Sequence, residues 1–435
     1  MNSKNGGGAR SPAKIAVIAM AGASIEYYDF FIYATAATLV FPTHFFARDL
    51  PAVVAQLGAF STFTVGFIAR PVGGLLFGHI GDLFGRKRAL ALALIMMGIA
   101  TTLVGVLPTY DVAGSLGAVL LVLLRFIQGL AVGGQWGGAA LLAIENAPAA
   151  KRGLYGSFVQ MGVPVGIVLA NGAFYLLDAT VSPAAFEAWA WRLPFLFSVV
   201  LVFLGLYVKN RLQDSPGYPD ELDPDGAAQK SPVLIALRDQ GLTIALAGGA
   251  FIASSGCFYM IITYGVSYGI NHAHASRSAL LLGVMLGSVL MMPALAWFAA
   301  LSDRYGRTGI YMSGAAATGL VSFALFPAID TRSAAAISLV MLAAMGAAAM
   351  MYGPQAALFA ELFEQRIRYS GASLGYQIGS ILGGGFAPII ATALYSEFAS
   401  TTVIAAYMAA MCAVSLACIA ALRRQRIAVN SPSLS

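Results

Sequence analysis

Twelve apolar stretches, each near the length of a bilayer-spanning helix, constrain the fold of this chain more than any other feature. They cover approximately residues 15–42, 53–79, 89–108, 116–143, 153–178, 190–208, 241–269, 277–300, 310–329, 335–362, 371–396 and 401–422. A helix needs about 20 mostly apolar residues to cross the hydrocarbon core. Because 59% of all residues are hydrophobic and only 10% are charged, the sequence predicts an all-α membrane protein with twelve transmembrane helices.

The positions of the basic residues predict how these helices are oriented. With the N-terminus in the cytoplasm, 19 of the 25 Lys and Arg residues fall in cytoplasmic segments. Only four fall in outer segments, namely Arg48, Arg192, Arg277 and Arg332, while Arg70 and Arg125 lie inside apolar stretches. Cytoplasmic loops carry the excess of Lys and Arg, so we expect a multi-pass protein with both termini cytoplasmic. The same rule accounts for the net charge of +6, which therefore does not indicate a nucleic-acid partner.

A polar segment near the middle of the chain divides the expected helices into two groups of six. We expect an N-terminal half at 1–208, a cytoplasmic linker at 209–240 and a C-terminal half at 241–435. A repeat supports this division, because GDLFGRKRAL at 81–90 returns as LSDRYGRTGI at 301–310. The repeat aligns Asp82 with Asp303 and Arg86 with Arg307, and a second repeat aligns Glu145 with Glu361 and Arg152 with Arg368.

Two carboxylates and an arginine within the apolar stretches form a candidate proton-coupling group. A charge at the centre of a membrane helix costs about 2.5–3.5 kcal/mol on insertion scales, so such residues are usually functional. Glu26 and Asp29 share one face of the first helix with Tyr33, and the helical rise places Asp29 at a depth similar to that of Arg125. We expect an ion pair between them. A substrate anion that competed for Arg125 would favour protonation of Asp29; alternatively, the pair is permanent and only orients the two helices.

A second arginine, Arg70, is expected near the bilayer midplane, where its planar fork suits a substrate carboxylate. Arg192 is expected at the outer mouth of the sixth helix, either contacting substrate or orienting the helix.

Further polar side chains fall within the expected helices and together suggest a pocket that hydrogen-bonds hydroxyl groups, although each one alone is also typical of a helix–helix contact. These candidates for substrate binding are Tyr33, Gln128, Gln135, Gln160, Tyr264, Tyr352, Gln355, Tyr376 and Gln377.

Several other classes of protein are disfavoured by what the sequence lacks. No Gly-Lys dipeptide occurs, so a phosphate-binding loop for ATP is excluded. Three cysteines and four histidines show no ligand spacing, so we expect no metal and no cofactor. No catalytic spacing of Ser, His and Asp or of paired acids appears, which disfavours an intramembrane enzyme, and no soluble signalling domain that would suit a membrane sensor is recognisable.

The repeated GDxxGR motif resembles the signature of the major facilitator superfamily, and longer segments resemble its metabolite:proton symporter branch. Those segments are EYYDFFIYA at 26–34, RFIQGLAVGGQWGGAALLAIENAPAAKRGLYGS at 125–157 and RYSGASLGYQIGSILGGGFAP at 368–388. The resemblance implies the major facilitator fold, in which two halves rock about a midplane site. It also implies gating residues at the cytoplasmic ends of the helices, here Asp82, Arg86, Glu145, Arg152, Asp303, Arg307, Glu361 and Arg368. This chain departs from the branch at Gln135, where a Glu is usual.

The resemblance implies proton-coupled uptake of a small organic acid, such as shikimate or a related cyclic or aromatic carboxylate, across the bacterial inner membrane. Two alternatives stay open. Glu26 and Asp29 could hold the cationic head of a zwitterionic osmolyte while Arg70 holds its carboxylate, or the substrate could be a dicarboxylate resembling α-ketoglutarate. In each case the expected partners are the small molecule, protons and the lipid bilayer, with no obligatory protein partner.

Overall fold

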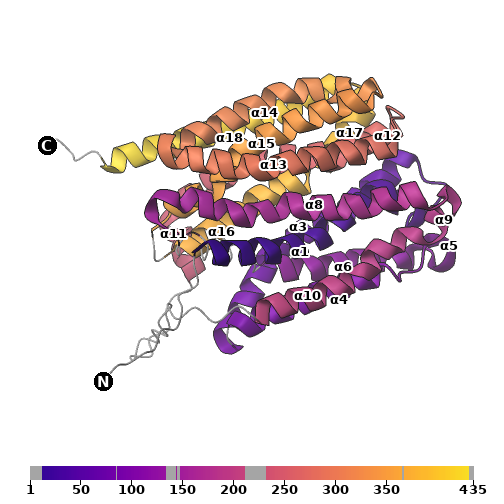
Figure 1. The fold of residues 1–435 in the computed structure, drawn as a ribbon, viewed down its shortest axis with the longest axis horizontal. Coiled ribbons are helices and arrows are strands. Elements are labelled where there is room, and N and C mark those ends of the chain that lie inside the picture. The colour runs from indigo at the N-terminus through magenta and orange to yellow at the C-terminus, as the bar shows by residue number, and fades with distance from the viewer. Residues whose placement is uncertain are drawn as a thin grey trace.

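The computed structural model describes residues 12–84, 86–133, 144, 147–210, 232–364 and 367–430. Long helices lie side by side with nearly parallel axes, and α18 ends at the same end of the bundle where α1 begins (Figure 1). Within the described residues, nine helical segments are long and apolar enough to cross a membrane. Helix α1, which carries Glu26 and Asp29, and helices α4 and α10, whose apolar segments are shorter, complete the twelve expected spans.

The helices before the central polar segment follow the expected order. The six long ones are α1 (Pro12–Leu39), α3 (Ala52–Phe84), α4 (Arg86–Val104), α6 (Ser115–Gly133), α8 (Arg152–Thr180) and α10 (Leu193–Asn210). Short helices connect them, namely α2 (Phe41–His44), α5 (Tyr110–Ala113), η1 (Ala149–Lys151), α9 (Pro183–Ala188) and η2 (Ala190–Arg192).

After the central segment, two spans are interrupted by π-helical turns that the sequence did not reveal. The seventh span consists of α11 (Pro232–Tyr259), η3 (Met260–Tyr264) and α12 (Gly265–Asn271), and the eleventh consists of α16 (Arg368–Gly379), η4 (Ser380–Gly385) and α17 (Ala387–Phe398). The others are α13 (Arg277–Tyr305), α14 (Arg307–Asp330), α15 (Ala334–Leu362) and α18 (Thr401–Asn430). Helix α11 has non-helical dihedral angles at Gln240, so helical structure begins within the expected linker and bends where the span was expected to start. π-helical turns within longer helices, such as η3 and η4, often occur at functional sites.

Glycines bring α3 and α6 into backbone contact. A Cβ added at Gly129 would overlap the carbonyl of Gly66, and one added at Gly133 would overlap the carbonyl of Arg70. Small residues at such spacing allow close approach of membrane helices. The close crossing places Arg70 on α3 next to the helix that carries Arg125.

The two sets of helices meet along α8 and α13, which lie side by side in Figure 1. At one end of this pair the Asp303 carboxylate accepts hydrogen bonds from the backbone N–H groups of Gly153 (3.0 Å) and Leu154 (3.1 Å) in the first turn of α8. Elsewhere Thr64 of α3 donates a hydrogen bond to the carbonyl of Gly385 in η4 (2.6 Å). These bonds satisfy polar groups at the contact between the two sets of helices.

Candidate functional site

Two buried arginines share one aromatic ring at the centre of the site. Arg70 is 4% exposed and Arg125 is 1% exposed. Their guanidinium carbons lie 4.7 Å and 4.4 Å from the centroid of Phe30 on α1. Arg70 also lies over Phe67 at 4.4 Å, and Arg125 lies over Tyr33 at 4.2 Å. Cation–π contacts of this kind stabilise a desolvated cation by about 2 kcal/mol.

No ion pair joins either arginine to a carboxylate within the part of the chain that the structure describes. The expected pair between Asp29 and Arg125 is therefore wrong. Successive residues of a helix are turned by about 100°, and it is Phe30 and Tyr33 that face Arg125. Asp29 instead neighbours Ser198 of α10, although neither side chain reaches hydrogen-bond geometry there. Both carboxylate oxygens of Asp29 are buried and have no hydrogen-bond partner among the described residues.

The guanidinium group of Arg125 is buried and is hydrogen-bonded on one side only. Its Nη1 donates to Oε1 of Gln128 at 3.2 Å, and Nε2 of Gln128 donates to the hydroxyl of Thr101 at 2.9 Å. Its Nε and Nη2 are buried without a hydrogen-bond partner in the described ranges, as is Nε of Arg70. Nε–H and Nη2–H form one edge of the guanidinium fork, which binds a carboxylate through two parallel hydrogen bonds. The two donors of this edge of Arg125 are therefore left without an acceptor among the described residues.

A tyrosine from the C-terminal helices completes this group. The ring of Tyr259, the last residue of α11, lies 5.5 Å from Phe63, 5.4 Å from Phe67 and 6.0 Å from Phe30. It is close enough to both Arg70 and Arg125 to interact with their charges. We call this set the arginine cage; it consists of Phe30, Tyr33, Phe63, Phe67, Arg70, Arg125 and Tyr259.

A second polar cluster adjoins the cage on the side of α15 and α16. The side chains of Tyr27, Tyr352 and Tyr376 are mutual neighbours, and Tyr259 is near both Tyr352 and Tyr376. The structure thus brings two of the predicted binding residues, Tyr352 and Tyr376, close to the arginines. Phenolic hydroxyls both donate and accept hydrogen bonds, so this tyrosine cluster suits uncharged polar groups of a ligand.

The remaining predicted binding residues make mostly structural contacts. Gln128 holds Arg125, and Tyr33 donates to Thr62 at 2.8 Å while its ring supports Arg125. Gln377 donates to the carbonyl of Gly133 at 3.4 Å, and Gln355 accepts from Ser254 at 2.9 Å. The other three predicted substrate-binding residues are Gln160, Tyr264 and Gln135. Gln160 is fully buried in α8, Tyr264 packs on Phe326, and Gln135 lies outside the described residues.

Arg192 lies apart from the cage and binds the turn after α4. Its Nη1 donates to the carbonyls of Gly105 (3.2 Å) and Leu107 (2.7 Å), just beyond the end of α4, and its guanidinium lies 4.4 Å from the Trp191 ring. Arg192 thus supplies donors to backbone carbonyls of this turn. This geometry favours the orienting role over the substrate contact.

Three of the expected gating residues pair with one another. Arg307 lies 3.0 Å from Asp303 and 2.6 Å from Glu361. Arg307 is the first residue of α14, and Asp303 lies near the end of α13. Arg368 donates to the carbonyl of Phe363 at 3.4 Å. Arg152 is exposed; Glu145 and the side chains of Asp82 and Arg86 lie outside what the structure describes.

The opposite end of the α8–α13 pair carries a charged cluster that sequence reasoning missed. Ser278 donates to Asp178 at 2.6 Å, and Arg277 lies 3.7 Å from Asp178 and 4.0 Å from Glu187. His44 lies 3.6 Å from the Glu187 carboxylate and 2.7 Å from its backbone carbonyl. Only Arg277 gave a sequence signal, as one of the few basic residues in the outer segments.

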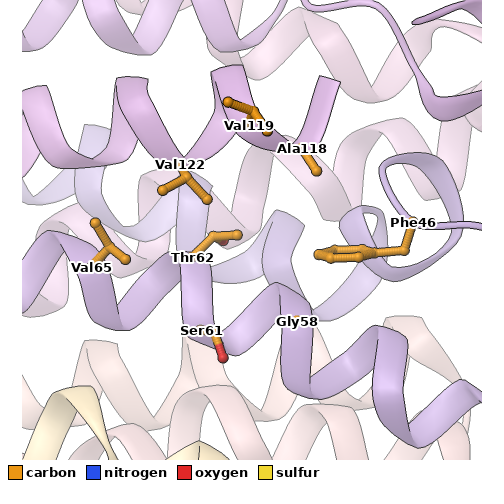
Figure 2. A pocket seen from close by; sticks show the side chains of 8 residues that line it. All are labelled: Phe46, Gly58, Ser61, Thr62, Val65, Ala118, Val119 and Val122. Atoms are coloured by element: carbon orange, nitrogen blue, oxygen red, sulfur yellow. The ribbon is translucent and has the colours of Figure 1, made fainter. Parts of the chain in front are cut away.

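A pocket of about 300 Å³ between α3 and α6 is not a candidate site for a polar substrate (Figure 2). Its lining is almost wholly apolar, and it opens beside Val119, which is 61% exposed. It is lined by Phe46, Gly58, Ser61, Thr62, Val65, Ala118, Val119 and Val122. In a bilayer this surface would face lipid. Among the described residues no group of three or more His, Cys, Asp or Glu side chains could hold a metal ion.

Comparison with known proteins agrees with the fold. The family model of the Major Facilitator Superfamily matches residues 19–383. The chain is 41% identical to the shikimate transporter of Escherichia coli K12 over 92% of each chain, and 30% identical to the proline/betaine transporter of the same strain over 93% of this chain and 82% of that one. A crystal structure of a D-xylose-proton symporter superposes with a TM-score of 0.74 at 19% identity, covering 95% of this chain and 97% of the other. The all-α, two-half architecture expected from the sequence is thus confirmed.

Proposed function

Since the chain belongs to the Major Facilitator Superfamily and is a multi-pass membrane transporter of metabolites and not an enzyme, we propose that it is a proton symporter. It imports a small organic acid, such as shikimate or a related cyclic or aromatic carboxylate, by alternating access. The observation that carries this proposal is the pair of buried arginines in the arginine cage, for which the described residues supply no carboxylate partner.

The cage favours an anion with a flat, partly apolar body. Leaving hydrogen-bond donors of a buried cation without partners costs several kcal/mol, and a substrate carboxylate that accepts from Nε and Nη2 of Arg125 and from Nε of Arg70 removes much of that cost. Phe30, Phe63 and Phe67 surround the arginines with aromatic rings, an environment that suits a substrate with an apolar cyclic body. The tyrosine cluster adjoins Tyr259, and its hydroxyls suit hydrogen bonding to ring hydroxyls of the substrate. Identity to the shikimate transporter supports the same class of substrate.

Asp29 is our candidate for the coupled proton. Its carboxyl group is buried and makes no ion pair with the arginines, so it can take up and release a proton without first breaking one. Glu26 lies one helical turn away and close enough to Asp29 to interact with its charge. An exposed carboxylate would exchange protons with bulk water in every conformation, whereas a buried one exchanges only when the halves open.

We place the protein in the bacterial inner membrane with both termini cytoplasmic, and assign 1–208 and 241–435 to halves that move about the linker at 209–240. In this assignment Asp303, Arg307 and Glu361 close the cytoplasmic end, and Asp178 and Arg277 close the outer end. The excess of basic residues in the segments assigned to the cytoplasm supports this orientation.

Two other substrate classes have specific support. A dicarboxylate could use both arginines, because Arg70 and Arg125 each lie over the Phe30 ring. A zwitterionic osmolyte could use Glu26 or Asp29 together with an arginine, and proline/betaine transporters are among the relatives.

Uptake into proteoliposomes loaded with a pH dye distinguishes these proposals. Labelled shikimate, succinate and glycine betaine would each be tested, with and without an inward proton gradient. We expect shikimate uptake that rises with the gradient and acidifies the lumen. Uptake of betaine alone would favour the osmolyte symporter, uptake of succinate alone would favour the dicarboxylate symporter, and uptake of any of them without proton movement would contradict symport.

A further inference from the structure

We infer that Tyr259 is a substrate-contacting residue, whose hydroxyl donates a hydrogen bond to the carboxylate held by the arginine cage and so connects substrate binding to the C-terminal half. The inference rests on the proposed function and extends it to a residue that no sequence pattern indicated. Its basis is the position of one tyrosine of the C-terminal half within a cage otherwise built by the N-terminal half.

The other members of the cage come from α1, α3 and α6. Phe30 and Tyr33 lie on α1, Phe63, Phe67 and Arg70 on α3, and Arg125 on α6. The Tyr259 ring enters this group from α11 and is 6% exposed. It makes edge-to-face contacts with Phe63 (66° between the ring planes) and Phe67 (87°), a geometry that stabilises aromatic pairs.

The space for the Tyr259 ring depends on the absence of a side chain at Gly384. A Cβ added at Gly384 of η4 would lie 2.7 Å from Cδ2 of Tyr259 and 2.6 Å from the hydroxyl oxygen of Ser255. Gly385, the next residue, accepts the hydrogen bond from Thr64 of α3. The π-helical turn η4 therefore contacts both the tyrosine and the helix that carries Arg70.

The chemistry of a phenol fits this position. Arginine side chains only donate hydrogen bonds, whereas a phenolic oxygen accepts one and its O–H donates one. The Tyr259 side chain lies beside the Arg70 guanidinium, so its oxygen can accept from Arg70 while its O–H is directed to a bound carboxylate. A phenylalanine would keep the ring contacts and lose both bonds.

Two variants of purified, full-length protein separate this contact from packing. Tyr259→Phe keeps the ring in the cage. Tyr311→Phe is the matched control, because Tyr311 is a fully buried tyrosine of the same half whose hydroxyl donates to the Ala250 carbonyl at 2.7 Å. Binding of labelled shikimate should weaken about tenfold in Tyr259→Phe, the usual effect of losing a hydrogen bond to a charged group, and should match wild type in Tyr311→Phe. Equal binding by wild type and Tyr259→Phe would overturn the inference.

A double-mutant cycle with Arg70→Gln adds a test that packing alone does not mimic. If Tyr259 and Arg70 contact the same carboxylate, the factors by which the two single variants weaken binding will not multiply in the double variant. Factors that do multiply would overturn the inference.

Tyr259→Gln and Tyr259→Leu are a second pair of variants for comparison, which does not depend on the folding of Tyr259→Phe. The glutamine amide can donate a hydrogen bond to the carboxylate, so Tyr259→Gln should bind shikimate more tightly than Tyr259→Leu. Equal binding by these two variants would contradict the contact.

Failure of the proposed function gives a different pattern. If neither wild type nor Arg70→Gln binds shikimate, both the proposed function and the Tyr259 contact are overturned. Binding by wild type that is lost in Arg70→Gln and unchanged in Tyr259→Phe would overturn the contact alone.

Discussion

Arg125 donates a hydrogen bond to Gln128, one helical turn later on α6, and Gln128 in turn donates to Thr101 of α4. The chain of bonds fixes the orientation of the guanidinium group, whose Nε–H and Nη2–H donors have no partner among the described residues. Thr101 donates onward to the carbonyl of Met97 at 2.8 Å, which anchors the chain to a helix backbone. Gln128 was predicted to bind substrate, and this geometry gives it the role of a positioning residue.

Loss of this anchor should weaken substrate binding without removing a charge. We expect Thr101→Val to bind shikimate about fivefold more weakly, because one hydrogen bond contributes about 1 kcal/mol. Thr102→Val is the control, since the Gly98 carbonyl of its own helix is the one partner of the Thr102 hydroxyl among the described residues. Measured dissociation constants that are equal for the two variants would remove Thr101 from the positioning chain.

Space beside Arg125 is provided by Gly66. A Cβ at that position would lie 2.6 Å from Nε of Arg125, so Gly66→Ala should displace the guanidinium and weaken binding roughly tenfold or more. Gly22→Ala on α1 should bind like wild type, because no described residue lies within 4 Å of its added Cβ. Normal affinity in Gly66→Ala would show that the Nε–Nη2 edge of Arg125 does not contact the substrate.

Proton coupling is tested at Asp29. Because an amide mimics the protonated carboxyl group and cannot release a proton, we expect Asp29→Asn to abolish accumulation driven by a proton gradient while exchange of internal for external substrate continues. Both rates are measured in the same proteoliposomes. Uphill accumulation at the wild-type level would assign the coupled proton to another group.

The charged cluster at the outer end should hold α8 and α13 together. Arg277→Gln removes both ion pairs of Arg277, and we expect a longer distance between spin labels at Thr180→Cys and Ser276→Cys in pulsed electron paramagnetic resonance. Arg48→Gln is the control, because Arg48 pairs with Asp111 within the N-terminal half. An unchanged distance distribution in Arg277→Gln would show that the cluster does not act as a latch.

The sequence predicted the spans and the two central arginines because length, hydropathy and the cost of a buried charge are properties of single segments. It did not predict the partners of those arginines, which are set by how helices rotate against one another. Phe30 is adjacent to the predicted Asp29, and no pattern distinguishes which of the two faces Arg125. Tyr259 is one of 18 tyrosines, and only the contacts of its ring with Phe63 and Phe67 of α3 identify it. The π-turns likewise lie in sequences compatible with α-helix.

Binding of shikimate to purified Arg70→Lys protein tests the central claim most directly. The substitution keeps the charge and removes the planar fork, and a charge-assisted bond contributes about 1.5–3 kcal/mol, or roughly 10 to 150-fold in affinity. The arginine cage predicts a dissociation constant weaker than that of wild type by a factor in that range. Equal dissociation constants for wild type, Arg70→Lys and Arg70→Gln would contradict it.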